Sequence, residues 1–184
     1  RMLCTAAIVM AFLGYFGEWL TLLPSELPSG AACSRVTESW SVMTKLDDFM
    51  PLTAENCGQF GADTRIVTGL DQVIASPAGL LEGQRLALVD VINSAAWILV
   101  VILLEIEVRV LTRWGGASMP LSRVATFAKA VLYAMLVAAA IYWGFKGDFL
   151  DFWDAALWLF AFVFIELNVF EWQQELRDQT SETL

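Results

Sequence analysis

The sequence predicts an all-α, polytopic membrane protein: a bundle of four transmembrane helices with one long outer loop. The chain of 184 residues is 58% hydrophobic, and its mean hydropathy is +0.61, above that of an average soluble domain. The apolar residues are concentrated in four blocks, each close to the roughly 20 residues that a helix needs to cross a bilayer. We therefore expect a single membrane domain over residues 1–184, with the lipid bilayer as a partner.

The four blocks define the expected elements. Helices are predicted over residues 3–23, 89–112, 123–143 and 152–172, with the outer loop over 24–88 and a cytoplasmic tail over 173–184. The first block is too long for the apolar part of a signal peptide, so we expect it to be retained. Ser76-Pro77 is a typical helix start, with serine as N-cap and proline in the first turn. The second helix can therefore begin there and project outside the membrane.

The outer loop is polar, and we predict one short amphipathic helix within it, over Thr37–Phe49. Cys33 and Cys57 flank this segment. In an oxidising compartment the two cysteines would form a disulfide, which closes a loop of about 25 residues and contributes on the order of 3 kcal/mol. Two free thiols are the alternative.

The distribution of lysine and arginine predicts the orientation, because cytoplasmic loops carry the excess of positive charge. The connection between the second and third helices is flanked by Arg109, Arg113, Arg123 and Lys129, whereas the turn after the third helix has one lysine against three aspartates. We therefore expect both termini in the cytoplasm and loop 24–88 outside. The compact chain has no Asn-x-Ser/Thr sequon, which favours the bacterial inner (plasma) membrane and a periplasmic loop.

Charged and polar residues inside the apolar blocks predict an intramembrane ionic layer. Its members are Glu105, Arg109, Lys129, Glu166 and Asn168. In this topology the two glutamates and the lysine each lie about 9 Å from the cytoplasmic interface. A charge in the bilayer is costly, so we expect Lys129 to pair with one or both glutamates and Arg109 to pair with Glu105, four residues earlier. The layer is either an ion-pair lock that fixes helix register or a proton or cation pathway.

Acidic residues near the opposite interface form a second predicted group, an outer acidic rim. Its members are Glu18, Asp90, Asp148, Asp151 and Asp154. Acidic rings line some cation pores, and a solvated exterior surface is the alternative interpretation.

Several function classes lack the residues that they need. The chain has no histidine, the commonest metal ligand and general base, and we predict no catalytic residue, metal site or cofactor. A net charge of −9 argues against nucleic acid as a partner, because that contact requires clustered lysine and arginine. In size and helix number the chain is similar to four-helix membrane thiol oxidases. Those enzymes carry a Cys-x-x-Cys pair in the outer loop, which the distant Cys33 and Cys57 do not match, so a membrane thiol-redox enzyme is the weakest alternative.

Small residues recur at helical spacing on the first and third helices, which permits close helix packing and predicts a homo-oligomer or a larger membrane complex. The leading hypothesis is a non-catalytic integral membrane subunit, a sensor or scaffold, for example in envelope sensing or in stress or defence signalling. The alternative is a cation-conducting homo-oligomeric channel that uses acidic residues of the second and fourth helices. In a channel these acids would face an axis or a water-filled passage, whereas in a scaffold they would be paired inside one chain.

Overall fold

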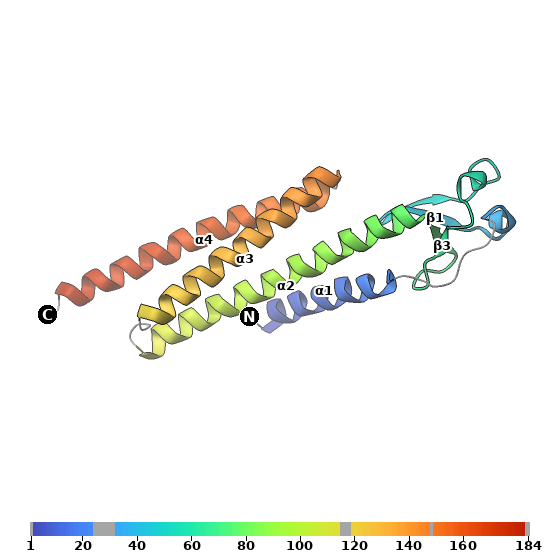
Figure 1. The fold of residues 1–184 in the computed structure, drawn as a ribbon. Helices are drawn as coiled ribbons and strands as arrows, with labels where there is room; N and C mark the ends of the chain where they lie inside the picture. Colours follow the sequence, from blue (N-terminus) through green and yellow to red (C-terminus); the bar gives the residue numbers. More distant parts are fainter. Residues whose placement is uncertain (1, 24–31, 115–118, 148, 183–184) are drawn as a thin grey trace. The chain divides into compact units, whose positions relative to one another are not determined.

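Four long helices dominate the computed structural model, which describes residues 2–23, 32–114, 119–147 and 149–182 (Figure 1). They are α1 Met2–Thr21, α2 Pro77–Trp114, α3 Met119–Lys146 and α4 Phe149–Glu182. The mainly helical fold is therefore confirmed. The chain is not all-α, however, because a small sheet forms between α1 and α2. The protein divides into two compact units, residues 1–101 and 102–184, which are described in turn.

The first unit contains a four-stranded sheet in the order β2-β1-β4-β3. Its elements are the 3₁₀ helices η1 Ala32–Glu38 and η2 Cys57–Gln59 and the strands β1 Ser41–Lys45, β2 Asp48–Pro51, β3 Arg65–Ile66 and β4 Val73–Ala75. β1 pairs antiparallel with β2 and parallel with β4, and β3 pairs antiparallel with β4. We call residues 32–76 the β-module.

The hairpin of β1 and β2 occupies the segment for which a helix was predicted, so the prediction of a helix over Thr37–Phe49 is wrong. Trp40, Met43 and Leu46 have helical spacing, but this pattern is misleading. Val42 and Met43 are consecutive and both almost fully buried, which a strand covered on both faces permits because successive side chains point to opposite sides. Asp47, between the strands, has a φ of 61°, which suits a turn and not a helix.

The two faces of the sheet build two separate cores. The core on the side of the 3₁₀ helices consists of Ala32, Trp40, Val42, Leu52, Cys57 and Ile74. The other, which we call the helix-side core, consists of Leu22, Met43, Val67, Val73, Ala75, Leu80 and Ala87. The second core takes residues from the end of α1 and the first turns of α2, so the sheet and these helix ends share one packed interior.

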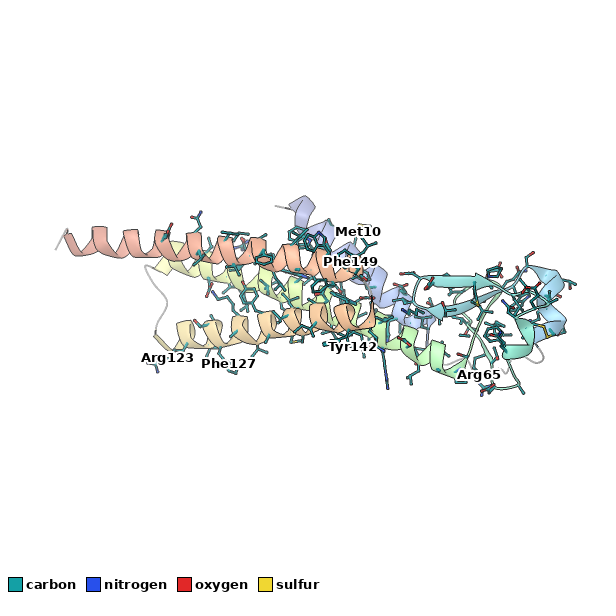
Figure 2. The ribbon with its side chains drawn as sticks, turned by 90° about the horizontal axis from the view of Figure 1, so that it is seen from above. Met10, Arg65, Arg123, Phe127, Tyr142 and Phe149 are labelled. Atoms are coloured by element: carbon teal, nitrogen blue, oxygen red, sulfur yellow. A yellow bond between two sulfur atoms is a disulfide. The ribbon has the colours of Figure 1, made fainter. Side chains whose placement is uncertain are left out.

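In the second unit, α3 and α4 pack along each other as a helical hairpin (Figure 1). Gly147 turns the chain between them with a φ of 79°, a conformation that glycine adopts without strain. The buried face of α3 consists of Leu132, Leu136, Ala139, Ala140 and Trp143. Large apolar side chains elsewhere on α3 are exposed, among them Phe127 at 72% (Figure 2) and Phe145 at 88%.

Two helices among the described residues are long and apolar enough to cross a membrane, over Pro77–Arg109 and Arg123–Lys146. A shorter apolar run, Ala6–Thr21, lies in α1. Two candidate spans are thus present, and the complete four-helix transmembrane bundle stays a prediction.

Candidate functional site

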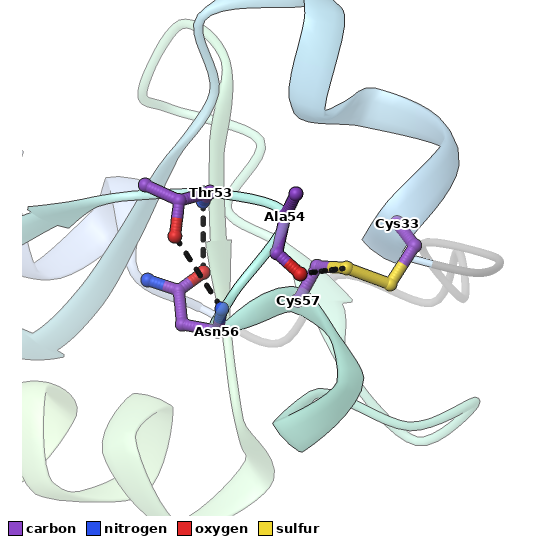
Figure 3. Close-up of a disulfide and its surroundings, with 5 residues drawn as sticks. All are labelled: Cys33, Thr53, Ala54, Asn56 and Cys57. Carbon is purple, nitrogen blue, oxygen red and sulfur yellow. Dashed lines mark hydrogen bonds between the residues drawn. A yellow bond between two sulfur atoms is a disulfide. The ribbon is translucent and has the colours of Figure 1, made fainter.

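The predicted disulfide is present between Cys33 in η1 and Cys57 in η2 (Figure 3). The turn that leads into η2 is held by reciprocal hydrogen bonds. The Thr53 N–H donates to Asn56 Oδ1 at 2.8 Å, and the Asn56 N–H donates to Thr53 Oγ1 at 3.4 Å. The Asn56 side-chain amide also donates to the Pro51 carbonyl at 2.9 Å. This network fixes the turn that leads into η2. The disulfide links η1 to η2, and these two short helices cover one face of the sheet.

Charged groups surround Trp40 on the same face. The indole Nε1–H donates to Glu38 Oε2 at 2.9 Å, and the Arg35 guanidinium lies 4.3 Å from the centre of the ring, within the range of a cation–π interaction. Trp40 itself is buried. The indole is thus tied to both charges of η1, and η1 is fixed to the sheet by more than its disulfide.

The sheet continues into α2 with one intervening residue. β4 ends at Ala75 and α2 begins at Pro77, and between them Ser76 caps the helix. Its Oγ accepts a hydrogen bond of 3.1 Å from the Gly79 N–H, and its carbonyl accepts one of 2.9 Å from the Leu80 N–H. The predicted helix start is confirmed, and no flexible linker separates β4 from α2.

Glycines let α2 approach β1 closely. A Cβ at Gly79 would lie 3.1 Å from the Met43 carbonyl oxygen, and a Cβ at Gly83 would lie 3.2 Å from Met43 Cε. Both distances are tighter than ordinary van der Waals contact. The spacing of four residues puts the two glycines on one face of α2. This face of α2, which the sequence pattern does not mark as a contact surface, is where the β-module contacts α2.

The end of α1 joins the same contact. The Gln84 side-chain amide of α2 donates to the Leu22 carbonyl, and Leu22 is 1% exposed. In the loop between β3 and β4, a Cβ at Gly69 would collide with Cβ of Thr21. The sheet, the end of α1 and the start of α2 therefore pack together, and we call this region the module junction.

Two turns further along α2, polar groups are buried. Asp90 and Ser94 are 8% and 6% exposed, and the Ser94 hydroxyl lies within hydrogen-bond distance of the Asp90 and Val91 carbonyls, at 2.8 and 3.0 Å. Asn93 Oδ1 is buried without a hydrogen-bond partner among the described residues. Asp90, which sequence analysis assigned to the outer acidic rim, is therefore a buried carboxylate. Buried ionisable groups in apolar helices are usually functional.

Two ion pairs of the second unit involve residues that sequence analysis assigned to an ionic layer. Arg109 Nη2 lies 2.9 Å from Glu105 Oε1, so the expected helical pair is present, with side chains 71% and 39% exposed. Lys129 Nζ lies 3.0 Å from Glu107 Oε2, and these side chains are only 14% and 25% exposed. Sequence analysis did not assign Glu107 to the layer, although its position between Glu105 and Arg109 indicated that it could belong there.

The other predicted site residues take part in neither of these ion pairs. Asn168 on α4 and Asp151 and Asp154 in its first turns are exposed. Glu18 is half-buried near the end of α1. The Glu166 side chain and Asp148 lie outside the described residues.

Comparison with known proteins gives no relative for this chain. No family model matches it, and neither a curated protein nor a solved structure is significantly similar. The function of this chain is therefore inferred from its own residues.

Proposed function

We propose that the chain is a non-catalytic integral membrane subunit that acts as a sensor in a homo-oligomeric or larger assembly of the bacterial inner membrane. In this proposal the β-module lies on the periplasmic side and both termini lie in the cytoplasm. α2 carries changes in the module into the membrane.

The observation that carries this proposal is the module junction. Leu80 and Ala87 of α2 belong to the same core as Met43, Val73 and Ala75 of the sheet, and one residue separates β4 from α2. Close-packed interiors transmit small shifts because they do not deform continuously. A ligand or partner that moves the sheet would therefore move the start of α2 with it.

The ion pairs support a sensor or scaffold in preference to a channel. Glu105 pairs with Arg109 of its own helix and Glu107 with Lys129 of α3, so both acids have a basic partner inside one chain, as expected of a scaffold. A liposome flux assay with Glu105→Gln and Glu166→Gln tests the channel directly. Cation flux that these changes abolish would establish the alternative.

The coupling itself is tested with neighbouring residues of β1. Val42 and Met43 are equally buried, at 2% and 1%, but Val42 belongs to the core beside the 3₁₀ helices and Met43 to the helix-side core. We expect Met43→Ala, in the full chain in lipid nanodiscs, to speed hydrogen exchange of α2 amides over 80–90 by at least about tenfold, because such truncations cost about 2–5 kcal/mol.

Val42→Ala is the matched control and should loosen η1 and η2 while exchange over 80–90 stays within about twofold. Equal effects of the two substitutions on α2, or none, would contradict the coupling. Labelling from either side of the membrane tests the location. In a Cys4→Ser background, Thr68→Cys should react from the periplasmic side only and Glu171→Cys from the cytoplasmic side only.

A further inference from the structure

The exposed residues of α2 follow one narrow line. Between residues 81 and 106, exposed side chains occur only at Leu81, Arg85, Leu88, Ile92, Leu99, Ile102 and Ile106. The six apolar ones are 38–49% exposed. Steps of four and three residues alternate along this line, with half-buried Ala95 filling the remaining position. We call these eight residues the α2 seam.

This spacing is the heptad pattern of two helices that wind around each other. Alternating steps of four and three give an average period of about 3.5 residues, and a strict stripe of this kind is narrower than the apolar face of an ordinary helix. α3 provides the contrast, because more than half of its residues over 123–146 are exposed, all around a broad arc. A broad arc of exposed residues is compatible with lipid, which surrounds a helix on all sides. A single line of exposed residues is compatible with one neighbouring helix.

The seam also crosses two environments. It begins at Leu81, next to the charged Glu82 and Arg85, and continues through Leu99, in the apolar stretch, to Ile106. Lipid would cover only the apolar part. A second copy of α2 has the same length and the same succession of polar and apolar residues, so it would cover the whole line.

The residue types favour a pair. Arg85, Ile92, Leu99 and Ile106 fall at the heptad position called a, and Leu81, Leu88, Ala95 and Ile102 fall at position d. The first part of the seam, with Leu81 and Leu88 at d and Ile92 at a, has the combination that favours two-stranded parallel coiled coils. The small Ala95 at d permits close approach of a second helix. A single polar residue at a fixes the register. Arg85 is that residue here, and Glu82 supplies the opposite charge in the same turn.

We propose that α2 pairs in parallel with α2 of a second copy of this chain along the α2 seam. This inference deepens the proposed function, on which it rests for the membrane setting, and names the chain itself as a partner. Parallel pairing follows from a shared membrane orientation. It brings the two helix starts together, and with them the two β-modules.

The proposal is tested by cross-linking the full chain in lipid nanodiscs or native membranes. In a Cys4→Ser background that keeps the Cys33–Cys57 disulfide, Leu88→Cys and Leu99→Cys are compared with Val131→Cys on α3, where Val131 is 43% exposed. We expect the seam variants to form disulfide-linked dimers at least about tenfold faster, because paired helices hold the thiols at a high effective concentration. Equal rates, or a faster rate at Val131→Cys, would overturn the proposal.

A second measurement uses truncation. Leu99→Ala should weaken dimerisation in detergent micelles about tenfold, which corresponds to about 1.4 kcal/mol, whereas Ile141→Ala on α3 should leave it unchanged. Leu99 and Ile141 are 49% and 51% exposed, so the two changes remove similar surface. A monomer at all concentrations would also reject the pair. The hydrogen-exchange effect of Met43→Ala is scored within one chain, so failure of the pair and failure of the sensor coupling are distinguishable.

Discussion

The module junction and the α3–α4 hairpin bury their residues in different ways. At the junction both faces of the sheet are covered, and Met43, Ile74 and Ala75 are at most 1% exposed. In the hairpin one face of α3 is buried, while Phe145 is 88% and Phe160 of α4 is 66% exposed. A soluble monomer seldom exposes contiguous apolar surface on this scale. The junction therefore has its own core, whereas the hairpin leaves much of its apolar surface exposed.

The two regions also differ in how their polar side chains are satisfied. The β-module satisfies side chains such as Thr53 and Asn56 through short local hydrogen bonds, as a fold in water does. The second unit joins α2 to α3 through the pair of Lys129 and Glu107. Ions can be placed in an apolar region only if they are paired. Each region is thus held by contacts of its own, so unfolding of one region should leave the other folded.

Removal of the disulfide is expected to have the largest effect. Cys33→Ser with Cys57→Ser should lower the free energy of unfolding of the β-module by about 3 kcal/mol, because the unfolded loop of this length gains entropy. Urea titration followed by hydrogen exchange of module amides would measure the loss. Exchange in α3 and α4 should not change, and Cys4→Ser is the control. An equal loss in both regions would mean that they unfold as one unit.

Adding one methyl group separates the two regions further. Gly79→Ala places a Cβ 3.1 Å from the Met43 carbonyl oxygen, which is backbone and cannot move aside, whereas at Gly144 the nearest atom, Phe152 Cδ2, lies 3.4 Å away. We expect Gly79→Ala to destabilise the junction by about 1–2 kcal/mol through overpacking. Gly144→Ala should stabilise the hairpin by up to about 1 kcal/mol through helix propensity. Unfolding monitored separately in each region by hydrogen exchange would measure both, and stabilisation by Gly79→Ala would refute the close approach.

Local signals in the sequence predicted the structure better than distant ones. Ser76-Pro77 predicted the helix start, and Glu105 with Arg109 predicted a pair within one helix, because these interactions join residues a few positions apart. The sheet was missed because β1 pairs with β4, about 30 residues later, and a spacing of three residues at Trp40 and Met43 resembled a helix.

The candidate site shows the same limit. The number of residues between a charge and the end of its helix predicts the depth of that charge. It does not predict toward which neighbouring helix the side chain points. Glu105 and Glu107 are about 200° apart around α2 at roughly 100° per residue, and the rotation of α2 brings Glu107 to Lys129. Gly79 and Gly83 do not indicate a packing surface in the sequence, since only the fold shows that β1 lies against them.

Loss of the α2 cap should have a smaller effect, confined to the junction. Ser76→Ala removes the acceptor of the Gly79 N–H and should destabilise the first turn of α2 by about 1 kcal/mol, whereas Ser76→Asp keeps an acceptor and should preserve stability. Hydrogen exchange of the first-turn amides is the readout. If both variants behave alike, the cap does not hold the sheet to α2.

The smallest expected effects distinguish the two ion pairs of the second unit. Arg109 is largely exposed and Glu105 partly exposed, so Glu105→Gln should cost only a few tenths of a kcal/mol. Lys129 and Glu107 are mostly covered, and Glu107→Gln should cost more, about 1 kcal/mol, because the lysine loses a charged partner in a less polar setting. A double-mutant cycle with Lys129→Met isolates the pair energy, measured by unfolding of the reconstituted chain in increasing SDS. If Glu105→Gln proved the more costly change, Glu105 would be the main carboxylate of the layer, and α2 would be rotated about its axis relative to α3 from the orientation described.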